Sequence, residues 1–253
     1  MSEDVRERFA PVAGNYASSS FHAGRAGLDE VVALARPQAG DVVLDVATGT
    51  GNTALVLAPL VARVTGLDLT SEMLAQARRL QRERGVGNAG WVLGNAEDLP
   101  FATGFFDLYT ARAAPHHFGD LEAALAEAAR VLRPGGRACF VDCSPPAEVR
   151  DLLHQVEVRR DPSHVLSRTV EEWTRLLEAA GFEVELAQRR ELDWENHGWM
   201  ANMAVPAELE QELAATIESA SGPARERLRP ERRDGRLWHA YWHALIRARR
   251  PAP

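Results

Sequence analysis

Residues 42–54 read V-V-L-D-V-A-T-G-T-G-N-T-A, and this stretch decides the fold of the chain. It opens with an apolar, largely β-branched run that is typical of a strand buried on both faces, as in the middle of a parallel sheet. Gly49 and Gly51 then allow the backbone to approach a ligand more closely than a Cβ would permit. A helix begins at Asn52 with free N–H groups at its start. The stretch therefore predicts a binding site for a polar small molecule.

A strand followed by a helix recurs along the chain up to about residue 144. Strands are predicted over 42–47, 64–69, 91–93, 106–110 and 137–141, and helices over 52–60, 70–84 and 121–132. This alternation predicts a parallel sheet covered by helices on both faces and joined by right-handed crossovers. The ligand is then expected beyond the carboxyl ends of the strands.

The segments on either side of this core follow other patterns. The spacing predicts helices within 1–36 and over 147–160, 169–180 and 208–219, and strands over 184–192 and 237–248, the last one closing the edge of the sheet. The stretch 194–205 is apolar and aromatic, and we interpret it as buried core, with a lid over the ligand as the alternative. Its bulky members are Trp194, Trp199, Met200 and Met203.

We expect one domain over 1–253. Its parts are a helical cap over 1–36, a cofactor-binding core over 37–144, helices with a sixth strand and the lid segment over 145–205, and a C-terminal helix with the last strand over 206–253. A chain of this length and 45% hydrophobic content can bury one large core.

Composition limits the class of protein. The formal net charge is −7, which argues against a general nucleic-acid binder, because phosphate contacts need clustered cations. The basic stretches 225–236 and 247–250 are interpreted as solvated faces. No run approaches the ~20 apolar residues of a membrane span, and the first residues lack a signal-peptide pattern. We expect a cytoplasmic protein acting on a small molecule, and leave open whether it is a monomer or a homodimer.

The cysteines and the paired histidines predict neither a disulfide nor a metal site. Cys139 and Cys143 lie four residues apart on one predicted strand, so they are about 13 Å apart on the same face. His239 and His243 have the same spacing on the last predicted strand. One ion cannot bridge such a distance.

The glycine motif alone leaves the type of ligand open. Gly49-x-Gly51-x-x-Ala54 matches the G-x-G-x-x-A dinucleotide pattern, and Asp68 ends the next strand at the separation expected for a ribose-binding acid. NAD and other adenosine ligands both fit this pattern. NADP is disfavoured because a carboxylate repels a 2′-phosphate.

Three further features favour a ligand other than NAD. Asp45 interrupts an apolar strand, where an ionised carboxylate costs free energy unless it is paired, and a cationic ligand would explain it. Residues 94–101, G-N-A-E-D-L-P-F, follow the third strand with polar groups suited to the edge of an adenine. Residues 133–136, R-P-G-G, turn sharply into the fifth strand.

With these motifs the sequence resembles the class I S-adenosylmethionine-dependent methyltransferases, in particular the ubiquinone/menaquinone-biosynthesis-like branch that acts on small molecules. The resemblance covers most of residues 10–185. It rests on V-L-D-V-A-T-G-T-G, V-T-G-L-D-L-T-S-E-M-L, G-N-A-E-D-L-P-F, F-D-L-Y-T-A-R-A-A-P-H-H-F and A-R-V-L-R-P-G-G-R. It implies a Rossmann-like, doubly wound α/β fold whose seven-stranded sheet is mostly parallel with an antiparallel last strand. It also implies S-adenosylmethionine as the methyl donor, S-adenosylhomocysteine as the product, and no metal.

The resemblance also implies roles for individual residues. The methionine end of the donor would face Asp45 and the backbone of residues 47–51, and its ribose would bind Asp68. Leu69 and Met73 would lie against the adenine. The candidate cofactor-binding residues are Tyr16, Asp45, Ala47, Thr48, Gly49, Gly51, Asn52, Asp68, Leu69, Met73, Asn95, Ala96, Glu97, Arg112 and His117.

Two positions depart from the family pattern. Ala47 stands where many members have the first glycine of the signature, and we expect it to adopt an extended conformation at the end of the strand. Asn95 replaces a frequent aspartate, so its contact with the adenine amino group must use the amide oxygen.

The reaction implied is an in-line displacement on a small, partly apolar or aromatic acceptor, such as a quinone precursor or a secondary metabolite. A general base is needed only if the acceptor must lose a proton. His117 is the first candidate, because residues 112–118 should form the floor between donor and acceptor; the alternative is an imidazole that only contacts the donor or packs the loop. His22 and His164 are further candidates, and Asp161 is interpreted as a turn former.

Two other functions use the same glycine turn. The first is a nicotinamide-dependent oxidoreductase, but the sequence lacks a Tyr-x-x-x-Lys pair, and Asp45 and the R-P-G-G turn would then be unexplained. The second is a protein that binds the cofactor without turnover. Binding of S-adenosylhomocysteine but not of NADH would favour a methyltransferase over the oxidoreductase. Formation of a methylated product would favour a methyltransferase over a protein that binds the cofactor without turnover.

Overall fold

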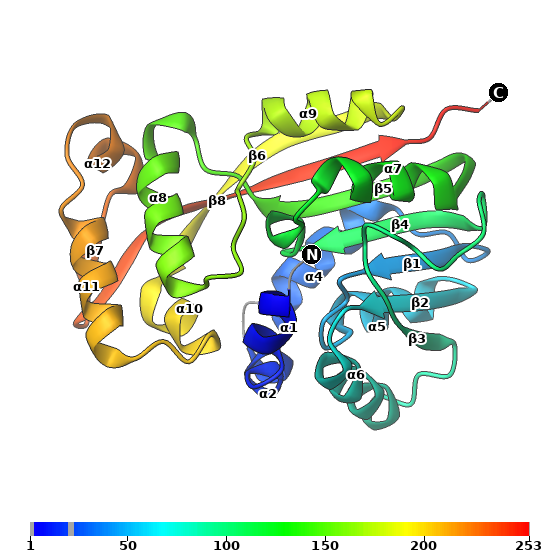
Figure 1. Cartoon of the computed structure of the whole chain (residues 1–253), viewed down its shortest axis with the longest axis horizontal. Coiled ribbons are helices and arrows are strands. Elements are labelled where there is room, and N and C mark those ends of the chain that lie inside the picture. The colour runs from blue at the N-terminus through cyan, green and yellow to red at the C-terminus, as the bar shows by residue number, and fades with distance from the viewer. Residues whose placement is uncertain (1–2, 20–22, 253) are drawn as a thin grey trace.

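The computed structural model describes residues 3–19 and 23–252 and contains one mixed sheet. In the described residues the strand order is β3-β2-β1-β4-β5-β8-β6, with β7 paired to β8, and Figure 1 shows the arrows in this order. The strands are β1 Val42–Val46, β2 Arg63–Asp68, β3 Ala89–Leu93, β4 Phe106–Arg112, β5 Leu132–Cys143, β6 Glu183–Glu195, β7 Glu231–Arg233 and β8 Arg236–Arg249.

The first five strands pair in parallel, and β8 runs antiparallel to both β5 and β6. The predicted fold class, a Rossmann-like sheet that is mostly parallel with an antiparallel last strand, is therefore confirmed. The predicted place of the last strand was wrong, because β8 lies between β5 and β6 and the edge is β6. Most of β8 is buried, as an interior strand requires. The short β7 and helix α12 were not predicted.

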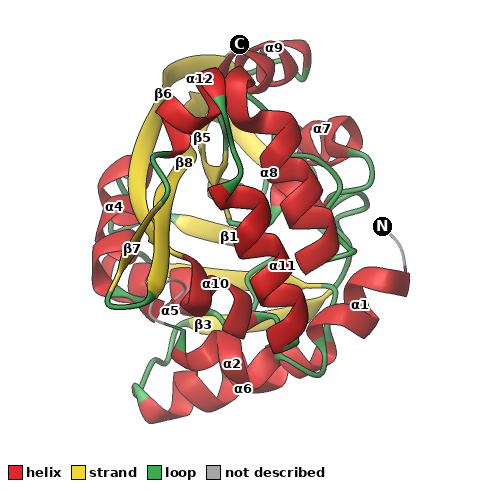
Figure 2. Ribbon diagram, turned by 90° about the vertical axis from the view of Figure 1, so that its left-hand side faces the viewer, coloured by secondary structure: helices red, strands yellow, loops and turns green. Residues whose placement is uncertain are grey.

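Helices cover both faces of the sheet. The helices are α1 Glu3–Phe9, α2 Ala13–Ser18, α4 Arg25–Ala35, α5 Asn52–Leu57, α6 Ser71–Glu83, α7 Leu121–Val131, α8 Ala147–Arg160, α9 Val170–Ala179, α10 Asn196–Asn202, α11 Ala207–Glu218 and α12 Gly222–Leu228, with 3-10 turns η1 Ala58–Leu60 and η2 Pro115–His117. The apolar sides of α7 and α9 pack on one face, and those of α4 and α5 pack on the other. Figure 2 shows α4 and α7 on opposite sides of the strands.

A second hydrophobic core lies beside the main sheet. It joins α8, α10, α11 and α12 to the far ends of β6 and β8, which continue past β5. The segment 194–205 belongs to this region, where it forms the end of β6 and α10. Its bulky side chains are at most 9% exposed, so they are buried, and Trp194 and Trp199 also line a cavity described below.

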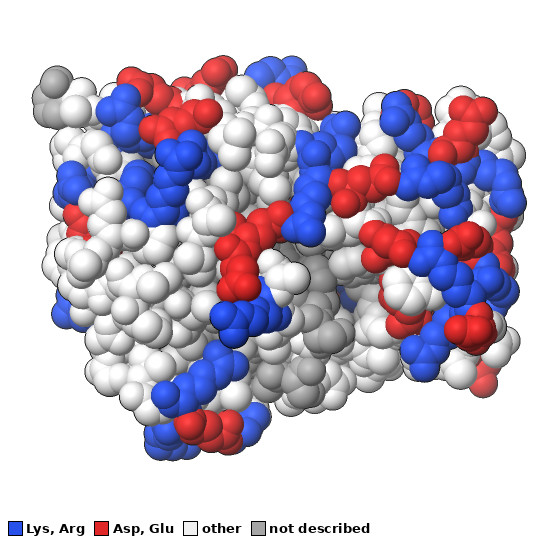
Figure 3. All heavy atoms as spheres, turned by 180° about the vertical axis from the view of Figure 1, so that it is seen from behind, with Lys and Arg blue, Asp and Glu red and all other residues white. Residues whose placement is uncertain are grey.

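Charged side chains of opposite sign are interleaved on the surface of this second core. Arg229 pairs with Glu191, Arg232 with Glu218, and Arg233 pairs with both Asp193 and Glu231. Figure 3 shows blue and red atoms side by side on the face seen from behind. The stretch 225–236 therefore presents balanced ion pairs on a solvated face.

None of the helices that the structure describes has the length and apolar character needed to cross a lipid bilayer.

Candidate active site

A cavity of about 850 Å³, counting its open mouth, lies at the carboxyl ends of β1, β2 and β4 under the cap helices α1 and α2. The wall includes most of the predicted cofactor-binding residues, namely Tyr16, Asp45, Ala47, Thr48, Gly49, Asn52, Asp68, Leu69, Met73, Ala96, Arg112 and His117. It also includes members of the stretches 47–51, 94–101 and 112–118, which were expected near the ligand, namely Thr50, Gly94, Ala113, Ala114 and Phe118. The residues that the sequence did not single out are Val5, Phe9, Thr53, Leu67 and Thr70. The parallel strands thus bring together residues far apart in sequence, as expected at this end of such a sheet.

Asp45 is a buried carboxylate held by two hydroxyls. Thr48 donates from Oγ1 to its Oδ2 at 2.5 Å, and Thr110 donates from Oγ1 to its Oδ1 at 2.7 Å. Burial raises the pKa of Asp45, while these two hydrogen bonds and the Arg112 guanidinium act in the opposite direction. The side chain faces the cavity, so it gives the wall a site with affinity for positive charge.

Asp68 connects the end of β2 to the glycine loop. Its Oδ2 accepts a hydrogen bond from the Gly49 N–H at 2.7 Å, and its Oδ1 accepts one from the Thr70 N–H at 2.9 Å. Burial raises the pKa of Asp68 to about 6. Each carboxylate oxygen can accept a second hydrogen bond, so Asp68 can hold the loop and two ligand hydroxyls at once.

The backbone of the glycine loop is bent at three places. Ala47 has φ +51°, so the prediction of an extended Ala47 was wrong: the turn needs a left-handed residue where many relatives have glycine. Gly49 has φ +54° and lies in the cavity wall with no atom close to where a Cβ would be.

Gly51 is needed for packing, which corrects its predicted role. It has φ +80°, and an added Cβ would lie 2.5 Å from the Trp91 ring and 3.0 Å from the Ala77 Cβ. Gly51 does not line the cavity, unlike Gly49. The second glycine therefore allows the start of α5 to pack closely against β3 and α6.

Arg112 is a cation at the end of β4, in the wall of the cavity. Its Nε donates a hydrogen bond to Thr53 Oγ1 at 3.1 Å. Burial lowers the pKa of Arg112, and the nearby Asp45 carboxylate raises it. Arg112 and Asp45 thus offer charges of both signs to the same part of the cavity.

Asn95 and Glu97 support the loop after β3 and do not line the cavity. The Asn95 amide oxygen accepts from the Glu97 N–H at 3.1 Å, and Glu97 Oε1 accepts from the N–H groups of Gly119 and Asp120. Ala96, between them, is buried in the wall. The structure thus shows a loop-holding role for both side chains that the motif did not predict.

A second cavity of about 480 Å³ adjoins the first. The two share Phe9, Tyr16, Ala113 and His117, and the second is otherwise lined by His116, Cys143, Glu157, Arg160, Trp194, Trp199, Asn202, Tyr241 and His243. It lies between the cap and the second hydrophobic core, and its walls are largely aromatic.

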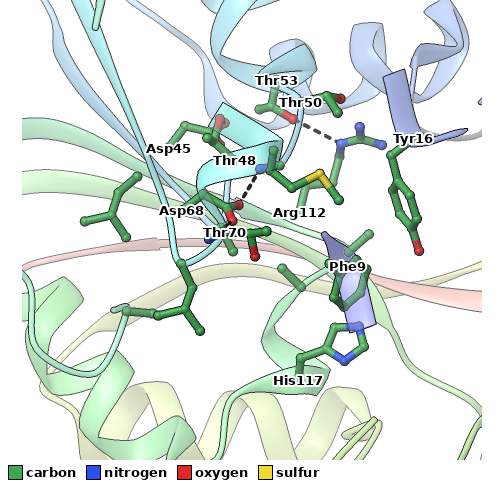
Figure 4. A pocket seen from close by; sticks show the side chains of 18 of the residues that line it. Phe9, Tyr16, Asp45, Thr48, Thr50, Thr53, Asp68, Thr70, Arg112 and His117 are labelled. Carbon is green, nitrogen blue, oxygen red and sulfur yellow. Dashed lines mark hydrogen bonds between the residues drawn. The ribbon is translucent and has the colours of Figure 1, made fainter. Parts of the chain in front are cut away.

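The predicted histidines occupy different places. His117 is in the wall shared by the two cavities, and Figure 4 shows it beside Phe9. Its Nδ1 donates to the Ser163 carbonyl at 3.1 Å, and burial lowers its pKa to about 3. His164 lines neither cavity, and burial lowers its pKa to about 2. His22 lies outside the described residues.

Asp161 forms the predicted turn and also a buried contact. Its Oδ1 accepts hydrogen bonds from the N–H and the hydroxyl of Ser163, at 3.0 and 2.6 Å, in the manner of an Asx turn. Its other oxygen lies 3.9 Å from His117 Nε2. The turn therefore fixes the loop against which His117 packs.

His116 and Asp142 form a pair that the sequence analysis missed. Nδ1 of His116 lies 2.5 Å from Oδ1 of Asp142, which is only 2% exposed at the end of β5. Burial alone would lower the pKa of His116, but the Asp142 carboxylate raises it well above its ordinary value. Asp142 interrupts an apolar strand just as Asp45 does, and this signal was available in the sequence.

This pair is also part of a potential metal-ligand set. Atoms of His116, Asp142 and Cys143 lie within 4.8 Å of one another in the described part of the chain, although the sequence predicted no metal site. A Zn²⁺ ion with bonds of ~2.0–2.3 Å holds its ligand atoms more than about 3 Å apart, so the His116–Asp142 contact has the geometry of a hydrogen bond. Both cysteines are free and buried.

Comparisons with known proteins agree with this architecture. Residues 44–140 match the family described as "Methyltransferase domain". The chain is similar to the methyltransferase YcgJ of Bacillus subtilis (strain 168), with 33% identity over 220 residues that cover 86% of this chain and 87% of YcgJ. A solved structure from Bacillus halodurans C-125 has 33% identity and a TM-score of 0.84, covering 90% of this chain and all of that one.

A relative that matches over a shorter stretch has a name that gives its pathway. The ubiquinone/menaquinone biosynthesis C-methyltransferase UbiE of Rubrivivax gelatinosus is 35% identical over 147 residues, which cover 56% of this chain and 57% of UbiE. The match to YcgJ extends over most of both proteins, and the parallel sheet carries its cavity where this fold binds its cofactor. The chain is an enzyme that belongs to the class I S-adenosylmethionine-dependent methyltransferases of the UbiE-like type.

Proposed function

We propose that this enzyme methylates a small, partly apolar or aromatic acceptor, of the quinone-precursor or secondary-metabolite kind, that binds in the second cavity. The observation that carries this proposal is the wall shared by the two cavities, made by Phe9, Tyr16, Ala113 and His117. The first cavity has the glycine loop and the carboxylates, and the second has aromatic walls. A donor in one and an acceptor in the other would meet at this wall.

The residues of the first cavity fit S-adenosylmethionine. Asp68 would take the ribose hydroxyls, because each of its oxygens accepts only one backbone N–H and can accept another hydrogen bond. Leu69 and Ala96 would lie against the adenine, and Arg112 and Asp45 would face the carboxylate and the ammonium of the methionine end. When bound, S-adenosylmethionine supplies a methyl group activated by a positively charged sulfur.

The chain then contributes alignment and exclusion of water. Holding two reactants in a near-attack geometry can supply about 7–11 kcal/mol, and the buried side chains around the shared wall keep out water that would compete with the acceptor. Of the two roles weighed for His117, burial favours contact with the ligands, because an imidazole whose pKa is about 3 is a weak base.

Cofactor affinity is expected to depend on pH through Asp68. Its pKa in the free protein is about 6, so below that pH the carboxyl group is protonated and loses its charge-assisted hydrogen bonds to ribose hydroxyls. Calorimetry should therefore show constant affinity for S-adenosylhomocysteine above about pH 7 and weaker binding as the pH falls through about 6. Asp68→Asn should remove this dependence, and an unchanged wild-type affinity at about pH 5 would argue against the ribose assignment.

Two substitutions test whether the donor binds in the first cavity and the acceptor in the second. Leu69 lines the first cavity alone and Trp199 the second alone. Leu69→Ala should raise the dissociation constant for S-adenosylhomocysteine by about 10-fold, because it removes roughly 1–2 kcal/mol of apolar contact. Trp199→Phe should leave this constant within about twofold and change KM for the acceptor. The reverse pattern would refute the assignment of the two cavities.

A further inference from the structure

The aromatic second cavity indicates the chemical class of the acceptor. We propose that the acceptor is a neutral hydroxyarene, that its hydroxyl oxygen receives the methyl group, and that its proton passes to His116, which Asp142 holds in place. This inference rests on the proposed function above, since it concerns the molecule that occupies the second cavity.

The charges in the second cavity balance each other. Arg160, which is 6% exposed, donates from Nε and Nη2 to Glu157 Oε2 at 3.3 and 3.2 Å. The other Glu157 oxygen accepts from the Tyr241 hydroxyl at 2.5 Å. The sequence contains no lysine, and no other arginine lines the described wall of this cavity. A carboxylate or phosphate acceptor would therefore be buried without a free counter-charge, which is costly, whereas a neutral acceptor would not.

The walls suit a flat ring. Trp194 and Tyr241 are stacked, with ring centroids 4.8 Å apart and an angle of 20° between their planes. Trp199 lies 5.5 Å from Tyr241 and also covers the Arg160 guanidinium, whose Cζ is 4.6 Å from the centre of its ring. Aromatic pairs favour stacked or edge-to-face contacts, so an aromatic acceptor would gain contacts here that an aliphatic one of equal size would not.

His116 is placed to accept a proton in this cavity. Asp142 engages Nδ1, which leaves Nε2 as the nitrogen available to a ligand, and His116 lines the second cavity and not the first. A carboxylate that orients an imidazole also stabilises the imidazolium formed when the proton arrives. The other titratable groups around His116 are Cys143 of β5, His117 of η2, His164 of the loop after α8 and His243 of β8.

The basicity of the site favours a phenolic hydroxyl. A phenol has a pKa of about 10, close enough to an imidazole raised by Asp142 for proton transfer, whereas an aliphatic alcohol is far less acidic. Methylation of a ring carbon activated by the hydroxyl involves proton transfer at two atoms, the hydroxyl oxygen and the carbon that receives the methyl group, whereas methylation of oxygen involves only one. The other imidazoles described in this wall, His117 and His243, are poor bases because burial lowers the pKa of each to about 3. One strong base in one place therefore suits methylation of oxygen, where the atom that loses the proton is also the atom that receives the methyl group.

The bonds, electrons and proton of the proposed methyl transfer can all be accounted for within this site. The hydroxyl oxygen forms a bond to the methyl carbon while the carbon–sulfur bond breaks, and its electron pair stays on sulfur to give neutral S-adenosylhomocysteine. The hydroxyl proton moves to Nε2 of His116, and the resulting imidazolium is paired with the Asp142 carboxylate. No oxidant, reductant or further reactant is needed.

The test uses the full chain with S-adenosylmethionine carrying a deuterated methyl group. Phenol, catechol and 1-naphthol are offered beside benzoate, benzyl alcohol and aniline, and products are identified by mass spectrometry and NMR. The expected result is a deuterated methyl ether from at least one hydroxyarene, formed faster as the pH rises and His116 loses its proton. Benzoate, benzyl alcohol and aniline should give no product.

Two substitutions separate proton transfer from a structural role. His116→Asn should lower kcat by about 10²- to 10³-fold, the range of general-base catalysis, and leave the dissociation constant for S-adenosylhomocysteine within about twofold. Asp142→Asn should shift the acidic limb of the pH profile to lower pH, because the carboxylate that raises the pKa of His116 is gone. The control His197→Asn changes an exposed imidazole paired with Glu210, and it should behave like the wild type.

Different results would overturn this inference and the proposed function. Methylation confined to a ring carbon, or to benzoate, benzyl alcohol or aniline, would overturn the inference. The inference would also be overturned if the protein binds S-adenosylhomocysteine but forms no methyl ether from any of the hydroxyarenes. A wild-type pH profile in Asp142→Asn would show that the pair of His116 and Asp142 is not the base. Failure to bind S-adenosylhomocysteine at all would overturn the proposed function as well.

Discussion

Replacing Asp68 with alanine is expected to raise the dissociation constant for S-adenosylhomocysteine by on the order of 10²- to 10³-fold, because hydrogen bonds to a charged group contribute about 1.5–3 kcal/mol each. Two effects act together. The ribose hydroxyls lose their acceptor, and the Gly49 and Thr70 N–H groups lose the carboxylate that holds the loop at the end of β2. Isothermal titration calorimetry of both proteins measures the change.

The matched control is Asp98→Ala, which removes an exposed carboxylate from the loop after β3. It should bind S-adenosylhomocysteine like the wild type. Circular dichroism should show that both variants are folded. If a folded Asp68→Ala protein keeps the wild-type affinity, Asp68 is not the ribose ligand.

The second large effect is expected on stability, at Gly51. Gly51→Ala should lower the free energy of unfolding by about 2–5 kcal/mol, since the left-handed conformation costs about 1–2 kcal/mol and overpacking adds about 1–3 kcal/mol. The added methyl group would meet the Trp91 ring at 2.5 Å. Denaturant unfolding of the wild type and the variant gives the difference.

Gly49→Ala provides the comparison. Gly49 shares the positive φ, but nothing lies within 4 Å of its missing Cβ, so only the conformational cost of about 1–2 kcal/mol remains. The loss caused by Gly51→Ala should also shrink in a Trp91→Leu background, where the ring is gone. Equal losses for the two glycine substitutions would mean that packing against Trp91 is not what requires glycine at position 51.

Much of the fold could be predicted because its core follows a simple rule of burial. Strands covered on both faces need largely apolar runs, and such a run stands out before the glycine turn at β1. The place of β8 did not follow from this rule. Alternation within 237–248 is equally compatible with an edge or an interior strand, and the choice depends on β6, which pairs with β8 from a distant part of the sequence.

Some features of the candidate site could likewise be predicted from the sequence, and others could not. The place of Asp45 and Asp68 in the cavity wall could be predicted because each stands out within or at the end of an apolar strand. The conformation of Ala47 could not, since a left-handed alanine is unfavourable on its own and is held here by the surrounding loop. The His116–Asp142 pair joins η2 to the end of β5, and sequence spacing alone does not show that these two segments meet.

The most direct test of the account is calorimetric titration of the purified protein with S-adenosylhomocysteine and, separately, with NADH. We predict saturable binding of S-adenosylhomocysteine with a micromolar dissociation constant, lost in Asp68→Ala, and no heat of binding with NADH. Binding of NADH without binding of S-adenosylhomocysteine would contradict the assignment of the first cavity and, with it, the proposed transfer of a methyl group.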